Sequence, residues 1–273
     1  MSEVSSHGFH NRTVIVTGAS LGVGRAAARF FHERGANVVM VARRLEPLQQ
    51  AAVGLERTLL VAADVADMDG MRDVMTQTIG RFGRIDGLVN NAGAHFRGPI
   101  EGRSSEQVGT MVDVNLRAPL VWSREVLPHL RAVGGGFIVN VASLAGKVPL
   151  DGAATYSATK FGLRAFTIAL AQELRGTGIT VSVVSPGPID TGFIMDEIDE
   201  VEDIVFSQTM CSADDVARMI VDCAQDGRLE REFPIGGAKL ATLGYLFPAL
   251  RRQLKPLLAA KGRRVKEKLR QGR

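Results

Sequence analysis

Two side chains that can exchange protons with a substrate lie one helical turn apart in this chain. Tyr156 and Lys160 are separated by four residues, so on a helix they share one face and can reach the same ligand. A phenol ordinarily titrates at about 10, and lowering its pKa to about 7 requires roughly 4 kcal/mol of additional stabilisation of the phenolate. The ammonium group of Lys160 can supply part of it. The pair therefore predicts an acid/base centre, in which Tyr156 transfers the proton and Lys160 lowers the pKa of Tyr156 and orients the ligand.

A glycine-rich turn, Thr17–Gly24, follows the first apolar segment and leads into an alanine-rich stretch. Its glycines permit a tight turn, close approach of a pyrophosphate and close packing of helix on strand. The N-terminus of the next helix offers free N–H groups and a positive dipole to phosphate. Such a turn can also be purely structural, but its place between strand and helix favours nucleotide binding. The predicted contacts in this turn are Gly18, Ser20, Leu21, Gly22, Val23 and Gly24.

The second apolar segment ends in Arg43 and Arg44, and Arg43 stands 19 residues after Gly24. An NAD site places Asp or Glu near this point, where the carboxylate accepts a hydrogen bond from the ribose 2′-hydroxyl. Arg43 instead offers a planar donor fork that suits a 2′-phosphate, and Arg44 adds charge. The alternative is a solvated arginine pair at the start of a helix. The pattern favours NADP(H) as the cofactor.

Apolar, β-branched segments alternate with segments of helical periodicity along the chain. The predicted strands are Thr13–Thr17, Asn37–Ala42, Thr58–Ala62, Ile85–Asn90, Phe137–Ala142, Ile179–Ser185 and Glu232–Ile235. The predicted helices are Gly22–Arg34, Leu45–Gly54, Met68–Phe82, Ser105–Arg131, Thr155–Arg175 and Ala213–Gln225, the last capped by Ser212. The acidic segment Asp190–Met210, with interspersed Phe193, Ile194, Ile198 and Phe206, is predicted to be a mobile lid over a pocket.

Continuous apolar strands joined by helices imply a parallel sheet covered by helices on both faces. Right-handed crossovers then give a doubly wound α/β fold of the Rossmann type, with about seven strands and ligands at their carboxyl ends. The length of 273 residues is that of one large domain rather than two. We predict a single NADP(H)-binding and catalytic domain at residues 1–236 and a helical, basic extension at residues 237–273.

Taken together, these motifs resemble the short-chain dehydrogenase/reductase family from about Thr13 to Pro234. The glycine turn matches the TGxxxGxG pattern, Asn90–Gly93 matches the NNAG element, and Tyr156–Lys160 matches the YxxxK motif. The resemblance implies an oxidoreductase that interconverts a carbonyl, ketone or aldehyde, and an alcohol by hydride transfer. It further implies a catalytic tetrad, which here is Asn115, Ser143, Tyr156 and Lys160.

Within this tetrad, the resemblance gives each residue a role. Tyr156 protonates the carbonyl oxygen while Ser143 donates a hydrogen bond to it. Lys160 is expected to bond the nicotinamide ribose, and Asn115 to hold a water that links Lys160 to solvent. The remaining cofactor contacts are the adenine-contacting pair, the NNAG element, the two catalytic residues and the segment expected to hold the nicotinamide carboxamide: Asp64, Val65, Asn91, Ala92, Gly93, Tyr156, Lys160, Pro186, Ile189 and Thr191.

One residue departs from the family pattern, since Leu21 stands where many NADP(H)-preferring relatives carry Arg or Lys. The 2′-phosphate must then depend more on Arg43. We weigh two other classes against the enzyme: an NADP(H)-binding regulatory protein without turnover, and a nucleic-acid binder. The intact tetrad argues against the first, and the lack of aromatic residues among the basic ones argues against the second.

Cysteine and histidine usage excludes some site types. Cys211 and Cys223 are too few for a disulfide framework, and neither they nor His95 and His129 have metal-ligand spacing, so we expect no metal. Neither a secretory signal nor an apolar run long enough to span a membrane occurs, and a cytoplasmic location is expected.

The predicted extension combines leucines at roughly helical intervals with a strong positive charge. Residues 251–273 hold ten Lys or Arg and one Glu, in a chain whose net charge is +4. Its apolar side can fold back on the body or on a second subunit, or it can lie on an anionic membrane surface. Pro248 and Pro256 are expected to break it into short helices, and Lys261–Arg273 to be disordered at its end. A homo-oligomer, dimer or tetramer, is also expected from the resemblance.

Overall fold

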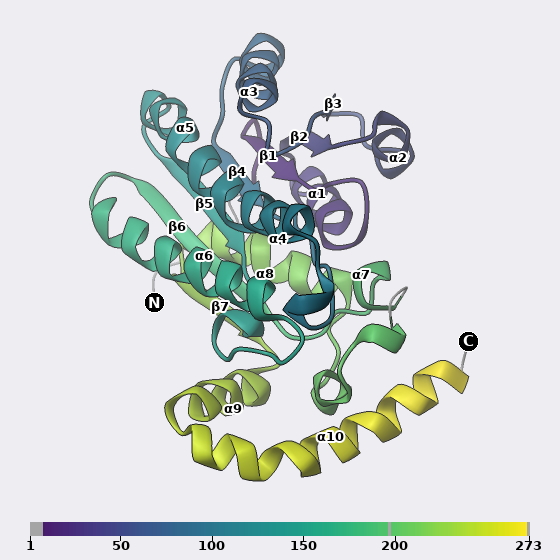
Figure 1. The fold of residues 1–273 in the computed structure, drawn as a ribbon. Coiled ribbons are helices and arrows are strands. Elements are labelled where there is room, and N and C mark those ends of the chain that lie inside the picture. Colours follow the sequence, from purple (N-terminus) through teal and green to yellow (C-terminus); the bar gives the residue numbers. More distant parts are fainter. Residues whose placement is uncertain (1–7, 196–197, 272–273) are drawn as a thin grey trace.

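A computed structural model describes residues 8–195 and 198–271, apart from the side chain of Phe193. It contains one seven-stranded parallel sheet with helices on both faces (Figure 1). The strand order is β3-β2-β1-β4-β5-β6-β7. The strands are β1 (Thr13–Thr17), β2 (Asn37–Ala42), β3 (Thr58–Ala62), β4 (Gly87–Asn90), β5 (Gly136–Val141), β6 (Ile179–Pro186) and β7 (Glu230–Phe233). The predicted doubly wound Rossmann fold is confirmed.

Each face of the sheet is covered because both sets of alternating strand residues are apolar. One face packs against α1 (Gly22–Glu33), α2 (Leu45–Ala51) and α8 (Ala213–Asp226). The other packs against α3 (Met68–Phe82), α5 (Ala118–Ala132) and α6 (Ala154–Glu173). The order in which strands are added to the sheet reverses between β1 and β4. The crevice at the carboxyl ends of such strands is where open α/β sheets bind ligands.

The last strand lies two residues earlier than predicted. Glu230–Phe233 pairs with Val183–Pro186, whereas the sequence pattern predicted Glu232–Ile235. Pro234 has no amide hydrogen to donate to the sheet, so pairing stops before it, and Ile235 already begins α9. The prediction was based on the apolar residues and did not take the missing amide hydrogen of Pro234 into account.

The predicted helix Ser105–Arg131 is interrupted. The structure has α4 (Ser105–Val112), a π-helical turn at Asp113–Arg117, and then α5. Pro119 lies in the first turn of α5, and a proline ring in a continuous α-helix would clash with the carbonyl of the residue four positions earlier, here Asn115. The wider turn avoids that clash. It also sets the position of Asn115, since π-turns change which way a side chain points.

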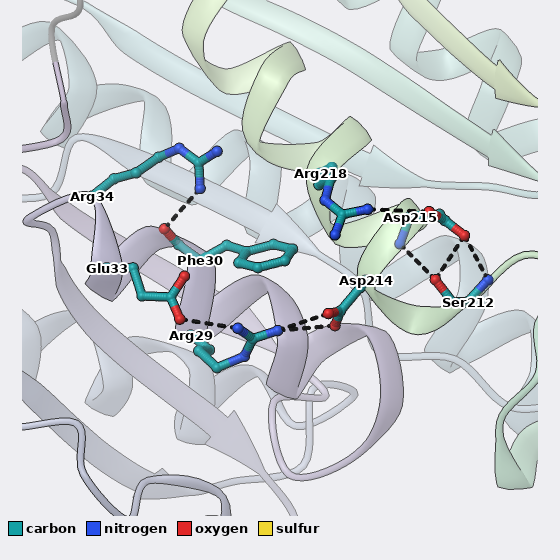
Figure 2. A network of polar contacts seen from close by, with 8 residues as sticks. All are labelled: Arg29, Phe30, Glu33, Arg34, Ser212, Asp214, Asp215 and Arg218. Carbon is teal, nitrogen blue, oxygen red and sulfur yellow. Dashed lines mark hydrogen bonds and ion pairs between the residues drawn. The ribbon is translucent and has the colours of Figure 1, made fainter.

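Helices α1 and α8 are joined by a polar network (Figure 2). Arg29 of α1 donates to both carboxylate oxygens of Asp214, each at 3.0 Å, in the first turn of α8. Ser212 accepts from the Asp215 amide at 3.0 Å and forms a reciprocal capping box with it, so the predicted helix cap is confirmed. The network holds the N-terminus of α8 beside the glycine turn that precedes α1.

The extension forms two helices, α9 (Ile235–Leu246) and α10 (Pro248–Gln271). The expected break at Pro248 is confirmed, since α9 ends at Leu246 and α10 begins at Pro248. The expected break at Pro256 is wrong, and residues 261–271 are helical rather than disordered, while residues 272–273 lie outside the described residues. Pro248 occupies the first helical position, where its missing N–H costs nothing, and Pro256 lies inside α10 without ending it. Within the described ranges, no helix combines the length and hydropathy needed to cross a membrane.

Helix α10 packs on the predicted lid, which contains α7 (Gly192–Met195) and 3₁₀ turns at Ile198–Glu200 and Asp203–Ser207. The shared cluster consists of Ile194, Met195, Ile198, Val201 and Phe206, with Val265 and Leu269 from α10.

The helix approaches the lid most closely at Gly262, where an added Cβ atom would lie 1.8 Å from the Asp203 carbonyl oxygen. Figure 1 shows α10 running along the edge of the molecule below this segment. The extension therefore packs on the body of its own chain.

Candidate active site

The glycine turn is built so that nothing but glycine fits at two of its positions. Gly18 has φ +65°, and a Cβ there would lie 2.9 Å from the Ala92 Cα. A Cβ on Gly24 would lie 2.1 Å from the Gly18 carbonyl oxygen. The N-cap residue of α1, Leu21, forms no side-chain capping hydrogen bond, and 65% of it is exposed. The first turn of α1 thus presents its amide groups to the open side of the turn.

Asn91 supports this turn from the strand beside it. Its Nδ2 donates to the Thr17 carbonyl oxygen at 3.0 Å and to that of Gly18 at 3.3 Å. The amides of Asn91 and Ala92 both donate to Thr17 Oγ1, at 3.0 and 3.1 Å. The side chain of Asn91 is therefore engaged in holding the turn in shape.

One cavity of about 1460 Å³ connects the glycine turn with the predicted catalytic residues. Gly24 and Asn115 lie behind its wall, and every other predicted site residue lines it. These lining residues are Gly18, Ser20, Leu21, Gly22, Val23, Arg43, Arg44, Asp64, Val65, Asn91, Ala92, Gly93, Ser143, Tyr156, Lys160, Pro186, Ile189 and Thr191.

Tyr156 and Ser143 meet at one end of this cavity. Ser143 follows β5 and its Oγ accepts a hydrogen bond from the Ala145 amide at 3.1 Å. The phenol of Tyr156, on α6, shares a hydrogen bond with the Ser143 side chain. Burial raises the pKa of Tyr156 above its ordinary value, while the bond to Ser143 and the charge of Arg97 lower it. A protonated phenol is thus held beside a second hydroxyl.

Lys160 lies one turn further along α6 and is almost completely buried. Its Nζ donates to the Val141 carbonyl oxygen at 2.9 Å and lies 5.7 Å from the centre of the Tyr156 ring. Burial lowers the pKa of Lys160 to about 8. The charge of Arg97 lowers the pKa of the Tyr156 phenol. The tuning of Tyr156 by Lys160 stays a prediction. Sequence reasoning did not single out Arg97.

Asn115 fixes the segment that follows β4. Its Oδ1 accepts from the Ala94 amide at 2.8 Å, and its Nδ2 donates to the Ala94 carbonyl oxygen at 2.7 Å. It also reaches Thr159 Oγ1 at 3.4 Å on α6. Asn115 thereby joins the π-helical turn both to α6 and to the residue that follows the NNAG element.

His95 is a site residue that sequence reasoning missed. Its ring stacks on that of Tyr156, with centroids 4.1 Å apart and planes 13° apart, and its Nδ1 lies 3.0 Å from Arg97 Nη1. Burial and the charges of Arg97 and Lys160 lower the pKa of His95 to about 3, so it is neutral at physiological pH. Sequence analysis considered it only as a metal ligand. Its place two residues after the NNAG element was the available signal.

A buried polar chain supports the strands below the tetrad. Asn90 on β4 donates to Asn140 Oδ1 on β5 at 2.8 Å, and Asn140 donates to Thr167 Oγ1 on α6 at 2.9 Å. These bonds tie α6, which carries Tyr156, to the two central strands. Sequence reasoning missed Asn140 and Thr167, because a polar residue in an apolar run has no partner visible in one dimension.

The other end of the cavity suits a dinucleotide phosphate. Arg43 and Arg44 are exposed at the end of β2, and neither forms an ion pair among the described residues. The Ala19 amide bonds to the Val41 carbonyl oxygen at 3.1 Å, which keeps the glycine turn against this strand. A narrow glycine cradle, an uncapped helix start and two cations fit a phosphorylated dinucleotide.

Comparison with known proteins agrees with this site. The family model described as short chain dehydrogenase matches residues 12–202. The chain belongs to the short-chain dehydrogenase family. An uncharacterised oxidoreductase of Staphylococcus epidermidis is 38% identical over 181 residues, which cover 66% of this chain and 79% of that protein. One of Staphylococcus saprophyticus is 36% identical over 185 residues, 66% of this chain and 75% of its own.

Two solved structures resemble most of this chain. A 3-ketoacyl-(acyl-carrier-protein) reductase from Brucella melitensis, complexed with NADH, has a TM-score of 0.76 at 27% identity and covers 83% of this chain and 98% of its own. A short-chain dehydrogenase/reductase of unknown function from Caenorhabditis elegans, with cofactor, has a TM-score of 0.74 at 29% identity, with 85% and 96% covered. A nicotinamide dinucleotide is therefore the cofactor type of the family.

The family match stops within the predicted lid. Residues 203–273, which include α8, β7, α9 and α10, lie beyond the matched range. The matched range contains the glycine turn and the predicted tetrad, and the helices of the extension lie outside it.

Proposed function

We propose that this short-chain dehydrogenase is an NADP(H)-dependent oxidoreductase that interconverts a ketone or aldehyde and an alcohol. The observation that carries the proposal is the meeting of Tyr156, Ser143 and Lys160 in the same cavity as the glycine turn. A protonated phenol next to a hydroxyl and an ammonium group is the arrangement needed to hold a carbonyl oxygen and give it a proton.

The cofactor, when bound, supplies or accepts a hydride at the substrate carbon. Tyr156 donates its phenolic proton to the carbonyl oxygen in reduction and takes it back in alcohol oxidation. Ser143 donates a hydrogen bond to the same oxygen, so that negative charge does not accumulate there. Lys160 orients the nicotinamide ribose, and Asn115 keeps the NNAG segment in place and is proposed to hold a water that links Lys160 to solvent.

The preference for NADP(H) over NAD(H) is part of the proposal, and it rests on Arg43. Its guanidinium is exposed at the end of β2 and lines the cavity beside Arg44 and Leu55. Leu21 adds no charge, so the 2′-phosphate depends on the arginine pair. Equal kcat/KM with NADPH and NADH would contradict this preference.

The test of the proposed reaction is oxidation of NADPH, followed at the nicotinamide absorbance, with a panel of ketones and aldehydes. We expect turnover with at least one carbonyl and none with Tyr156→Phe. The alternative, an NADP(H)-binding regulatory protein without turnover, predicts tight cofactor binding by calorimetry and no oxidation with any member of the panel.

Three broader features complete the proposal. We propose that residues 1–236 form the catalytic domain, that residues 237–273 form an extension packed on it, and that the enzyme works in the cytoplasm as a dimer or tetramer. Both cysteines, Cys211 and Cys223, are buried free thiols whose pKa burial raises to about 11, which suits a reducing compartment. Light scattering coupled to size-exclusion chromatography measures the oligomer.

We also propose that the outer face of α10 contacts an anionic membrane surface. Leu257, Lys261, Arg264 and Lys268 are spaced so that they fall on one face of the helix, and all four are exposed. None of the three cations forms an ion pair among the described residues, whereas Lys255, Arg263 and Lys266 on the inner side pair with acidic groups of the body. An apolar start followed by unpaired cations complements anionic lipid.

A flotation assay with phosphatidylglycerol and phosphatidylcholine vesicles tests this contact. We expect binding to the anionic vesicles alone. Replacing Lys261, Arg264 and Lys268 by Glu should lower it by about a hundredfold or more, since each cation contributes about 1 kcal/mol. The control replaces Arg72, Arg81 and Arg124, which lie elsewhere on the surface. The proposal would be overturned if the wild-type protein did not bind the vesicles and instead dimerised through this face.

A further inference from the structure

The cavity that contains Tyr156 has a second wall, which is made by the extension. Leucines of α9 and α10 line it, and they come from the region beyond the family match. These residues are Leu240 and Leu243 on α9 and Leu250, Leu254 and Leu258 on α10. The part of the pocket wall that lies beyond the family match is therefore largely aliphatic.

The two cations of α10 that reach the cavity are already engaged. Arg251 donates to the Pro149 carbonyl oxygen and Lys255 pairs with Asp151, both on the loop between Ser143 and α6. The bond to Lys255 lowers the pKa of Asp151. These contacts hold α10 against the catalytic loop and leave the aliphatic stems of the two side chains facing the cavity.

The opposite side of the same space combines apolar side chains with polar ones of the lid, which are Glu202, Ser207 and Gln208. Leu150 and Val148 come from the loop after Ser143, and Ile204 and Val205 come from the lid. At the rim, Leu243 and Leu250 are 46% and 43% exposed. An apolar surface thus continues from the region of Tyr156 to solvent.

The size of the cavity agrees with two ligands. Pockets for one small molecule measure roughly 300–1,000 Å³, and this cavity measures about 1460 Å³. The glycine turn and the arginine pair account for one end. The end bounded by α9, α10 and the lid remains for a substrate with a sizeable apolar body.

We propose that the substrate is a carbonyl compound with a long aliphatic chain, which lies between the α9–α10 wall and the lid while its carbonyl group meets Tyr156. This inference rests on the proposed oxidoreductase function and adds the substrate class. Burying one methylene group contributes about fourfold to binding, so the wall distinguishes long chains from short ones without any polar contact.

The first test measures kcat/KM with NADPH for unbranched methyl ketones from butan-2-one to decan-2-one. We expect a rise of about twofold to fourfold per methylene, mostly through a lower KM. Leu254→Asn should flatten this dependence because Leu254 lines the cavity. Leu257→Asn is the matched control, since Leu257 lies on the same helix, does not line the cavity and is 70% exposed. A rate independent of chain length overturns the proposal.

A second test needs no turnover. Decan-2-ol should raise the melting temperature of the wild-type protein more than butan-2-ol does, and Leu258→Trp, which narrows the same space, should remove the difference. If this binding occurs but no ketone is reduced, the proposed redox reaction fails while the chain site stands. If ketones are reduced but neither variant changes the chain-length dependence, the assignment of the chain to this wall is wrong.

Discussion

Two lysines are buried in the part of this chain that the structure describes, and they differ in what surrounds them. Lys160, in the catalytic site, is 4% exposed and donates to a single backbone carbonyl, that of Val141. Lys266, in the extension, is 6% exposed and donates to the Val201 and Asp199 carbonyls at 2.7 and 3.3 Å, with the Asp203 carboxylate at 3.5 Å. The fold compensates the charge of Lys266 with several acceptors, whereas the charge of Lys160 has only one.

The difference separates a structural cation from a functional one. A buried charge with enough partners acts as a clamp, here between α10 and the lid. A buried charge with few partners has unused capacity to bind a ligand, and its pKa moves toward the neutral form. The lowered pKa of Lys160 is the sign of a group that awaits a further partner.

The largest effect is expected at the catalytic end of this comparison. Tyr156→Phe removes the proton donor and leaves the ring that stacks on His95. Turnover should fall by at least about a hundredfold, and NADPH affinity, measured by fluorescence titration, should stay within a few-fold. Retention of more than about a tenth of the wild-type rate would show that another group transfers the proton.

The lysines themselves give the second prediction. The pKa of Lys160 is lowered from 10.5 to about 8, so between these values the unfolded state binds more protons and the stability of the folded state rises with pH. Below about pH 8 the folded protein bears the full cost of the buried charge. Lys160→Met should therefore raise the free energy of unfolding at pH 7, by up to about 3 kcal/mol, although it abolishes activity.

Lys266→Met is the matched control in urea denaturation. It should lower stability at the same pH, because it leaves two carbonyl oxygens without their donor and removes one of the two cations that pair with Asp203, the other being Arg263. The comparison breaks down if both substitutions destabilise the protein equally.

The third prediction concerns the cofactor end of the site. Arg43→Ala removes a charge-assisted donor fork, an interaction of about 1.5–3 kcal/mol. The ratio of kcat/KM for NADPH to that for NADH should fall by about tenfold or more. Arg57→Ala is the control, since Arg57 directly precedes β3 and does not line the cavity, and it should leave the ratio unchanged.

The fourth prediction tests the clamp. Gly262→Ala places a methyl group against the Asp203 backbone, so α10 must move away from the lid. We expect faster amide exchange in α10 and a several-fold higher KM for decan-2-one, with little change for butan-2-one. Gly80→Ala in α3 is the control, because nothing lies within 4 Å of its added Cβ, and it should stabilise the helix slightly.

The smallest effect is expected from Arg97→Gln. The charge of Arg97 lowers the pKa of Tyr156, so its loss should raise that pKa. Alcohol oxidation requires the phenolate, and its rate rises with pH through this pKa. The midpoint of that rise should move to higher pH by less than about one unit, and Arg97→Lys should restore it. A midpoint that does not move would show that the charge of Arg97 does not affect the pKa of Tyr156.

The sequence predicted those parts of the molecule in which residue type alone carries the chemistry. The glycines of the first turn and the Tyr156–Lys160 spacing could be interpreted without knowledge of distant neighbours. The π-turn at Asn115 could not, because periodicity continues through it and the cause is a clash involving Pro119. His95 was dismissed, since its importance lies in a contact with a ring 61 residues away.

The extension was the hardest part to predict for the same reason. Pro256 was expected to end a helix, yet α10 continues through it while one side is held by the lid. Gly262 gave no signal in one dimension, because its role is defined by the Asp203 carbonyl oxygen that approaches it. Tertiary packing outweighed local propensity at both positions.

The order in which the two walls of the pocket occur along the chain has a consequence for biosynthesis. The sheet, the glycine turn and the tetrad are complete once Phe233 has been made, whereas the α10 wall follows only after residue 248. Because domains fold progressively during translation, a nascent chain can assemble its nucleotide site before it possesses the surface that selects the substrate. A chain released before α10 is made would then have the nucleotide site and a pocket that lacks the α10 wall.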